Sequence, residues 1–421
     1  MGHLLLLLYS LLAPAIAALY ALYFLLSPRR SLMKALGGEL RERLGLSAPE
    51  AGERPVWIHA ASVGEVKAVS RLAPELAKRL GAPLLFTCST AAGRAEAARL
   101  GAASLAPLDF YPLAAAFIAS ARPRMLILVE TEIWPATLYA AANAGVTVYM
   151  VNARLSASTA ALYRALGPFS RLAFTGIRKV LAQSAADAAR FSALPGMEGK
   201  VEVTGNLKHD MVGASAEGQD KVRAFIGAAG WKDAPIFTAG STHPPEEPAV
   251  IDAWLEARKK APELRLVLVP RHPERLGETE GALASRGVKF TRWSKASGRS
   301  APCLIVDAMG LLQAFYSVSS VCFVGGTLDD TGGHNLLEPA LFGKPALFGP
   351  NYRNARSAGD ALLEGKGGFL AGTAPEMAGL LAALLTDEAA MKAASDNSAR
   401  TLASLKGATA RTIAAIAGPA Q

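Results

Sequence analysis

Short apolar runs alternate with longer alanine-rich stretches along most of this chain, and the alternation falls into two series. Strands that alternate with helices predict parallel sheets with helices on both faces. We therefore expect an α/β protein with two Rossmann-like doubly wound domains facing a cleft. The predicted strands are Val56–His59, Leu84–Thr87, Met125–Val129, Thr147–Val151 and Lys179–Ala182 in the first series, and Ile236–Ala239, Leu264–Val269, Cys303–Val306, Val321–Val324 and Pro345–Phe348 in the second.

The seam between the two series lies between Gly205 and Asp233, and the small, polar stretch GASAEGQ at 213–219 is the best linker candidate. We expect an N-terminal acceptor-binding domain at 28–212 and a C-terminal donor-binding domain at 220–400. A final helix within 401–421 is expected to pack back on the first domain. Ligands of doubly wound sheets bind at the carboxyl ends of strands, so functional residues should follow the strands directly.

Residues 4–26 carry no charged side chain and are predicted to form a transmembrane anchor. A run of this length spans the ~30 Å of bilayer hydrocarbon as a helix. Basic residues follow it from Arg29 onward, and the positive-inside rule then places the body of the chain on the cytoplasmic face of the inner membrane. The alternative is a cleaved signal peptide, but the run lacks both a basic region before it and a small-residue cleavage site after it.

The chain has a net charge of +9, which suits anionic lipid or phosphorylated substrates. Nucleic acid is excluded as a partner because no dense basic patch is interleaved with aromatic residues. The three cysteines, Cys88, Cys303 and Cys322, are far apart and sit in apolar runs, which argues against a disulfide framework or a zinc site. Neither G-x-G-x-x-G after the first strand nor a Walker A sequence is present, which argues against a nicotinamide enzyme and a P-loop NTPase.

Five stretches that follow predicted strands carry the polar residues expected of a site: ASVGEV (61–66), VETEIWP (129–135), AGSTHPPEE (239–247), LVPRHPER (268–275) and FVGGTLDDTGGHNLLEPALFGKPALFGP (323–350). In their order and spacing, together with GNLKHD (205–210), they resemble the transferases of 3-deoxy-D-manno-oct-2-ulosonic acid (Kdo), which have the GT-B fold. The resemblance implies an inverting, metal-independent glycosyltransferase without a cofactor. Its donor would be CMP-Kdo, and its acceptor the tetra-acylated lipid A precursor (lipid IVA) of lipopolysaccharide.

Glu65 allows two readings. Ser62 and Glu65 fit S-x-x-E, the capping box that closes a helix N-terminus. Alternatively, Glu65 is a general base that takes the proton from the attacking sugar hydroxyl. The resemblance favours the base, because Glu65 matches the family's catalytic residue, and the two roles are expected to exclude each other in part.

Glu132 is the second candidate catalytic carboxylate, with Glu130 two residues earlier. Charge at a helix N-terminus is the alternative for both residues, and the resemblance favours Glu132 as a residue that orients the acceptor or Glu65. Trp134 and Pro135 are expected to serve packing and the turn.

The donor carries a phosphate diester and a carboxylate, so its site needs fixed positive charge and backbone N–H groups. The guanidinium of Arg271 suits such an anion, and the two neighbouring prolines stiffen its loop. His272 either contacts phosphate or bonds a backbone carbonyl. Ser241, Thr242 and His243 follow a strand and are expected to cradle phosphate.

Glycines at 325, 326, 332 and 333 allow the backbone to approach a ligand, with Gly332 and Gly333 assigned to the donor site. HNLLEP (334–339) is expected to start a helix whose N-terminus favours an anion, with Asn335 as ligand or cap. The resemblance implies that Glu338 holds the ribose and that Met309 and Gly310 lie near the cytosine. Asp329 and Asp330 depart from the family pattern, and their role is open.

Two other readings compete with a Kdo transferase. One is a membrane-associated GT-B enzyme that uses a UDP-sugar, and the other is a non-catalytic protein that binds anionic membrane lipid. The apolar run from Leu105 to Ile118 either faces the membrane or forms a core helix. The number of Kdo residues added, the oligomeric state and the accommodation of the acyl chains are not encoded in any motif.

Overall fold

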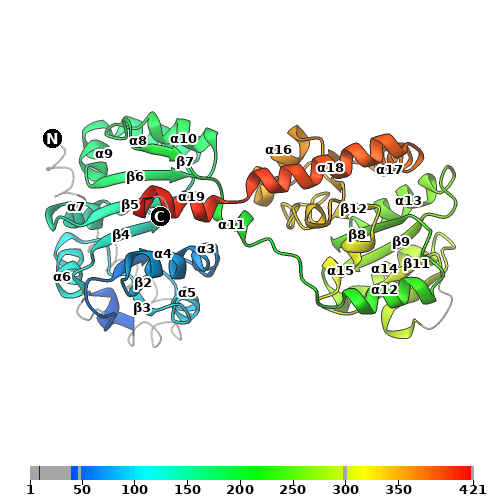
Figure 1. Ribbon diagram of the computed structural model, residues 1–421, viewed down its shortest axis with the longest axis horizontal. Helices are drawn as coiled ribbons and strands as arrows, with labels where there is room; N and C mark the ends of the chain where they lie inside the picture. The colour runs from blue at the N-terminus through cyan, green and yellow to red at the C-terminus, as the bar shows by residue number, and fades with distance from the viewer. Residues whose placement is uncertain (1–8, 10–38, 46–48, 297–300, 419–421) are drawn as a thin grey trace, which may run out of the picture. The chain divides into compact units, whose positions relative to one another are not determined.

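The computed structural model describes residue 9 and residues 39–45, 49–296 and 301–418. The chain divides into two compact units, one formed by residues 1–211 with 407–421 and the other by residues 212–406. Each unit contains a seven-stranded parallel sheet, so the predicted α/β architecture of two Rossmann-like units is confirmed (Figure 1).

The first unit has the strand order β3-β2-β1-β4-β5-β6-β7. Its strands are β1 (Val56–His59), β2 (Leu84–Cys88), β3 (Ala102–Leu105), β4 (Met125–Val129), β5 (Thr147–Ala153), β6 (Ile177–Ala182) and β7 (Val201–Val203). Its helices are α3 (Val63–Val69), α4 (Leu72–Leu80), α5 (Ala91–Ala97), α6 (Tyr111–Ala121), α7 (Pro135–Asn143), α8 (Ala157–Ala165), α9 (Gly167–Phe174), α10 (Ala185–Ser192), α11 (Leu207–Asp210) and α19 (Ala408–Ala417).

Side chains alternate between the two faces of this sheet, as the pleat of a strand requires. In β1, Val56 and Ile58 pack with helices α3, α4 and α19, whereas Trp57 packs with α6 and α7 on the other face. Both faces are covered, and for this reason the central strands read as continuous apolar runs. Phe117 and Ile118 of α6 are buried in this core, so the core-helix alternative is confirmed for this part of the run from Leu105 to Ile118.

The second unit has the strand order β10-β11-β9-β8-β12-β13-β14. Its strands are β8 (Ile236–Thr242), β9 (Arg265–Pro270), β10 (Phe290–Arg292), β11 (Cys303–Ile305), β12 (Val321–Val324), β13 (Ala346–Phe348) and β14 (Gly368–Leu370). Its α-helices are α12 (Gln219–Ala228), α13 (Glu247–Ala257), α14 (Leu276–Ala284), α15 (Leu312–Val318), α16 (Arg356–Glu364), α17 (Ala374–Thr386) and α18 (Glu388–Leu405). Its 3₁₀ helices are η1 (Pro273–Arg275), η2 (Trp293–Lys295), η3 (Pro339–Phe342) and η4 (Arg353–Ala355).

Helices α13, α14 and α17 cover one face of this second sheet, and α12, α15 and α16 pack against the other. The chain passes between the units at 211–212 and again at 406–407. The second passage leads into α19, whose Ile413 and Ile416 pack on the core of the first unit. The carboxylate of Asp210 accepts the backbone N–H groups of Gly407 and Thr409, which anchors the start of α19 beside α11.

All three cysteines are buried free thiols. In the part of the chain that the structure describes, no helix combines the length and the apolarity that crossing a membrane needs. The expected anchor at 4–26 lies outside the described residues, apart from Tyr9. The hydroxyl of Tyr9 donates to the Asp109 carboxylate at 2.8 Å.

Candidate active site

The sheet order places the two acidic motifs of the first unit at one edge. From β1 the chain proceeds outward to β2 and β3, and β4 then returns to the other side of β1. The point between β1 and β4 is therefore the topological switch point, where doubly wound sheets bind ligands beyond the strand ends. Glu65 lies in α3, directly after β1, and Glu132 lies between β4 and α7.

Glu65 is half-buried and accepts two hydrogen bonds from its own helix N-terminus. Ala61 N–H donates to Oε2 at 2.7 Å, and Ser62 Oγ–H donates to Oε1 at 3.0 Å. Ser62 also caps α3 by accepting the Glu65 backbone N–H. The capping interaction is thus present, but each carboxylate oxygen has two lone-pair directions and keeps one for another donor. The cap orients the carboxylate without occupying it fully.

The pKa of Glu65 is raised above its ordinary value. Burial is the largest cause, and the hydrogen bond from Ala61 opposes it in part. The negative charge of Glu132 also raises this pKa, which puts the two carboxylates within electrostatic range of each other. A raised pKa makes Glu65 a stronger base than an ordinary glutamate, provided that it is ionised.

Glu132 shows the opposite shift. Burial works to raise its pKa, but the hydrogen bond from His59, the charge that this ring carries when protonated and the hydrogen bond from Trp134 together outweigh burial, and the pKa is lowered. His59 Nε2 lies 3.3 Å and Trp134 Nε1 2.9 Å from the same oxygen, Oε2. The pair therefore consists of one carboxylate that readily takes a proton and one that stays ionised. Environments that separate two carboxylates in this way are typical of acid–base sites.

Glu130 does not share partners with Glu132. It adopts a left-handed conformation with φ 60°, which is strained for a residue with a Cβ, and such strain clusters at functional sites. Its Oε1 pairs with Lys208 Nζ at 2.7 Å, so a cation from α11 stands beside the acidic cluster. The charge of Glu130 also contributes to the raised pKa of Glu65.

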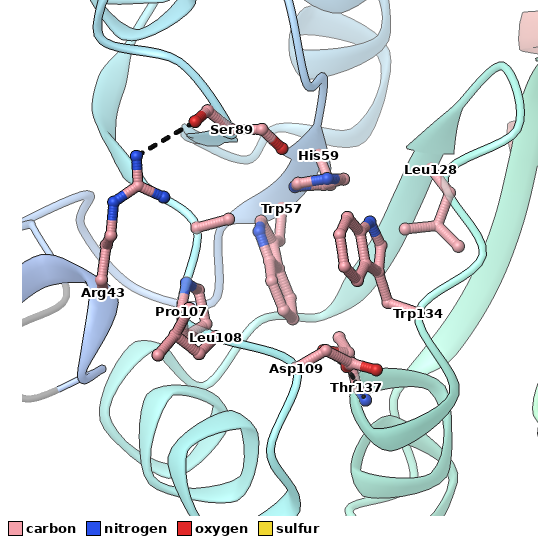
Figure 2. A pocket seen from close by; sticks show the side chains of 11 residues that line it. Arg43, Trp57, His59, Ser89, Pro107, Leu108, Asp109, Leu128, Trp134 and Thr137 are labelled. Carbon is pink, nitrogen blue, oxygen red and sulfur yellow. Dashed lines mark hydrogen bonds between the residues drawn. The ribbon is translucent and has the colours of Figure 1, made fainter. Parts of the chain in front are cut away.

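A pocket of ≈ 140 Å³ has His59 and Trp134, the two hydrogen-bond partners of Glu132, in its lining. Figure 2 shows the indole of Trp57 in its wall with His59 and Trp134 next to it, and Arg43 on the opposite side. The lining residues are mostly apolar: Arg43, Trp57, His59, Ser89, Ala106, Pro107, Leu108, Asp109, Leu128, Trp134 and Thr137. Trp134, expected to serve packing only, thus lines a pocket and also bonds Glu132.

The second unit places its polar motifs at the switch point between β8 and β12, which are neighbours in the sheet. Ser241 has φ 54°, so it is, like Glu130, a non-glycine residue in the left-handed conformation. Thr242 is buried, and its hydroxyl donates to Glu247 at 3.0 Å, so this hydroxyl is engaged inside the protein rather than presented to a ligand.

Glu246 occupies backbone N–H groups that the glycine loop was expected to offer to a ligand. It is fully buried, and its Oε1 accepts the N–H groups of Thr327 and Leu328. Its Oε2 accepts the N–H groups of Gly326 and His243. Four backbone donors in this loop and turn are therefore bound to an internal carboxylate.

An imidazole pair lies next to this loop. His243 Nε2 is 3.0 Å from His334 Nε2, and the two rings are stacked. His243 Nδ1 lies 3.7 Å from Asp329 Oδ2, which gives the unexpected Asp329 a basic neighbour. Burial lowers the pKa of His334, and the positive charges of His243 and Arg271 lower it further.

Arg271 is exposed, and its guanidinium has no hydrogen bond or ion pair within the described residues. It is thus available to an anionic ligand. His272, in contrast, contacts Glu274 Oε1 at 3.0 Å, a partner that neither of its two sequence interpretations included. Arg275, four residues after Arg271, is already paired with Glu278.

The prediction that a helix starts at HNLLEP (334–339) is wrong. Residues 336–338 form turns, and only the 3₁₀ helix η3 follows, from Pro339 to Phe342. Pro339 has no N–H to donate to the Asn335 carbonyl, so an α-helix capped at Asn335 cannot propagate. Asn335 instead accepts the Leu337 N–H and donates to Glu338 at 3.4 Å.

Burial raises the pKa of Glu338, while the hydrogen bond from Asn335 opposes the shift. Gly332 and Gly333 both have positive φ, and an added Cβ would press against Arg353 and Asn354 at the first and Tyr352 at the second. Met309 is 74% exposed, and Gly310, which follows it, is exposed as well. Within the described ranges, no three His, Cys, Asp or Glu side chains are grouped as a metal site would need.

Sequence reasoning did not identify His59, Lys208, Glu246 and His334 as site residues. Each stands inside or next to a recognised motif: WIHAASVGE, GNLKHD, AGSTHPPEE and TGGHN. Their position near a motif was the only available signal, because their partners are distant in sequence.

Comparison with known proteins identifies the family. Residues 38–211 match the family model described as 3-deoxy-D-manno-octulosonic-acid transferase (kdotransferase). The 3-deoxy-D-manno-octulosonic acid transferase of Bordetella pertussis is 36% identical over 340 residues, 77% of this chain and 78% of the relative. The enzyme of the same name from Chlamydophila psittaci is 33% identical over 333 residues, 76% of each chain.

A solved structure, Anabaena Alr3699/HepE in complex with UDP, has a TM-score of 0.54 at 16% identity and covers 85% of this chain and 97% of its own. This likeness supports the fold alone. The sequence relatives go further, because they are more than 30% identical over most of both chains, and the predicted resemblance is confirmed. The chain belongs to the 3-deoxy-D-manno-octulosonic acid transferase family of glycosyltransferases.

Proposed function

We propose that this protein transfers Kdo from CMP-Kdo to the tetra-acylated lipid A precursor in lipopolysaccharide biosynthesis, with inversion at the anomeric carbon. The observation that carries this proposal is the pair Glu65 and Glu132, whose pKa values are shifted in opposite directions at one strand edge. A hydroxyl acceptor needs a base, and the raised pKa of Glu65 suits that task.

In the proposed reaction, a sugar hydroxyl of the acceptor attacks the anomeric carbon of Kdo. The bond from that carbon to the CMP phosphate oxygen breaks, and the hydroxyl proton passes to a free lone pair of the Glu65 carboxylate. Glu132 remains ionised, orients the acceptor and holds the basicity of Glu65 high through its charge. The pocket lined by Trp57 and Trp134 offers the amphiphilic acceptor an apolar surface next to the partners of Glu132.

The donor is assigned to the second unit. CMP leaves with negative charge on its phosphate, and preorganised positive groups stabilise that charge. Arg271 is an unpaired guanidinium next to the imidazoles of His243, His272 and His334, which suits the phosphate or the Kdo carboxylate. Gly332 and Gly333 would admit the donor to the backbone, while Ser241 and Thr242 shape the turn. By family resemblance, Glu338 holds the ribose, with Asn335 donating a hydrogen bond to its carboxylate, and Met309 with Gly310 borders the cytosine.

Residues 4–26 are proposed as a single-pass anchor that keeps the catalytic units on the cytoplasmic face of the inner membrane. The uncharged run and the basic residues after it support this assignment. The anchor would bring the active site to an acceptor that itself resides in the membrane, and anionic lipid would attract the basic residues.

The test is transfer of labelled Kdo from CMP-Kdo to the purified precursor in detergent with EDTA. Arg271→Ala should raise KM for CMP-Kdo roughly 10- to 100-fold, the effect of losing a charged hydrogen-bonded contact of about 1.5–3 kcal/mol. Arg275→Ala is the matched control, since Arg275 is paired with Glu278 on the same loop, and it should leave KM unchanged. Transfer from a UDP-sugar instead, or inhibition by UDP as strong as that by CMP, would contradict the proposed donor.

A further inference from the structure

A chain of hydrogen bonds leads from the core of the first unit to Glu132. Trp57 Nε1 lies 2.8 Å from Thr87 Oγ1, and Thr87 Oγ1 lies 2.9 Å from His59 Nδ1. His59 Nε2 then lies 3.3 Å from Glu132 Oε2. Thr87 is fully buried in β2, and His59 at the end of β1 is only 4% exposed. Strand pairing places His59 directly beside Thr87.

The direction of each bond follows from the chemistry of the groups. An indole N–H can only donate, so Trp57 donates to Thr87 Oγ1. The Thr87 hydroxyl proton then needs an acceptor, and among the described residues His59 Nδ1 is the remaining partner of this oxygen. An imidazole that accepts at Nδ1 carries its proton on Nε2. That proton points at an ionised carboxylate, which can only accept.

The opposite tautomer fails at both ends. With its proton on Nδ1, His59 would present the Nε2 lone pair to the Glu132 carboxylate, so that two acceptors would face each other. The buried Thr87 hydroxyl would also lose the acceptor for its proton, and leaving a buried polar group unsatisfied is costly.

We propose that the buried hydroxyl of Thr87 fixes His59 in the tautomer protonated at Nε2, and that His59 thereby holds the Glu132 carboxylate oriented and ionised beside Glu65. Thr87 and His59 are then positioning residues for the reaction, because they act through Glu132 rather than on the substrate. The role of this chain in transfer rests on the proposed function, whereas the tautomer itself does not.

The charged surroundings of Glu132 come from several elements. Glu65 on α3 and Tyr163 on α8 are both within its electrostatic reach. Glu130 contributes to the same acidic cluster and is paired with Lys208 of α11. The described groups that bond Glu132 directly are the Trp134 indole and His59. Loss of the His59 hydrogen bond would therefore leave Glu132 among other acidic groups, with the indole as its remaining donor.

The sign of the pH effect follows from treating Glu65 and Glu132 as a coupled pair. The reactive form has both groups ionised. If the His59 proton moves to Nδ1, Glu132 takes up a proton more readily, while the affinity of Glu65 for a proton beside an ionised Glu132 is unchanged. The first proton then binds the pair at higher pH. The pH at which the rate falls on the acid side can therefore only increase.

Nitrogen-15 NMR of the histidine-labelled full chain tests the tautomer without reference to activity. The chain has six histidines, and the His59→Gln spectrum identifies the missing signals. We expect His59 of the wild type to be neutral, with its proton on Nε2. Thr87→Ser should retain this pattern, and Thr87→Val should weaken it, because one of the two groups that select the tautomer is gone. A proton on Nδ1 in the wild type, an imidazolium at neutral pH, or an unchanged pattern in Thr87→Val would each overturn the proposal.

Kinetics then test the link to the reaction. Kdo transfer by the wild type, Thr87→Ser and Thr87→Val is followed at saturating substrates from acid to mildly alkaline pH. The acid limb of Thr87→Val should rise by at most about one pH unit, the effect on Glu132 of losing one hydrogen bond to a carboxylate, while Thr87→Ser follows the wild type. An unshifted limb, or a loss that is equal at every pH, would overturn the positioning role. Absence of transfer by the wild type would refute the proposed function and leave the tautomer result standing.

Discussion

Glu246→Gln changes one atom of a fully buried carboxylate that binds four backbone N–H groups. Each oxygen accepts two of them, at 2.7–3.0 Å. In either orientation of the glutamine amide, its NH₂ group faces two N–H donors that cannot reverse their direction. Two hydrogen bonds to a charged group are lost, each worth about 1.5–3 kcal/mol, so the opening of this loop should become easier by about 3–6 kcal/mol.

Glu247→Gln is a matched control, because Glu247 is the next residue and is also buried. Its partners are the hydroxyls of Thr242 and Thr279, which can rotate to accept from an amide. Burial raises the pKa of Glu247, so above that pKa its ionisation costs folding stability, and the cost disappears as the pH falls. We expect Glu247→Gln to be as stable as the wild type at neutral pH, or more stable.

Amide hydrogen exchange of the full chain, read by mass spectrometry, resolves this difference within the second unit. Peptides that cover the end of β8 and the loop after β12 should exchange roughly 10²- to 10⁴-fold faster in Glu246→Gln. The same peptides in Glu247→Gln should exchange as in the wild type. Equal exchange in the two variants would refute the argument that backbone N–H groups, unlike hydroxyls, cannot turn to accept a hydrogen bond from a glutamine amide.

Three further outcomes follow from the first unit. Lys208→Ala removes the cation paired with Glu130, and this loss of positive charge should raise the pKa of Glu65 and move the acid limb of the rate profile to higher pH. Lys179→Ala, whose lysine is paired with Glu202 and remote from the cluster, should leave the acid limb in place. In the wild type, transfer should fall as the pH drops through the pKa of Glu65, at a pH above the ordinary glutamate value of 4.5. Asp109→Ala removes the carboxylate that accepts two N–H groups at the start of α7, and amides of α7 should exchange roughly 10- to 100-fold faster, in keeping with the usual cost of losing a helix cap.

The ten strands expected from the sequence are all present, and the four that it did not predict are the edge strands of the two sheets, β3, β7, β10 and β14. Their sequences AASL, VEV, FTR and GFL are short, and most of their residues are at least partly exposed. Inner strands are covered on both faces and become apolar throughout, which makes them visible in a sequence. An edge strand has no such requirement.

The placement of the motifs at strand ends was predictable because the carboxyl ends of parallel strands meet at one edge. The identity of the hydrogen-bond partners was not. Glycines after β12 were expected to let a ligand approach the backbone, yet Glu246, eighty residues earlier in the chain, accepts the N–H of Gly326. His59 likewise acquires its role from Thr87 and Glu132, which only the folded sheet brings together.

The most direct test of the account compares Kdo transfer by the wild type and Glu65→Gln in full-length protein. Glu75→Gln serves as the control, since Glu75 lies exposed on α4 and pairs only with Arg71 in the described part of the chain. We expect Glu65→Gln to remain folded and to bind CMP but to lose transfer by roughly 10²- to 10⁴-fold, the usual contribution of a general base, while Glu75→Gln transfers normally. Equal transfer by Glu65→Gln and the wild type would show that Glu65 is a helix cap and not the base.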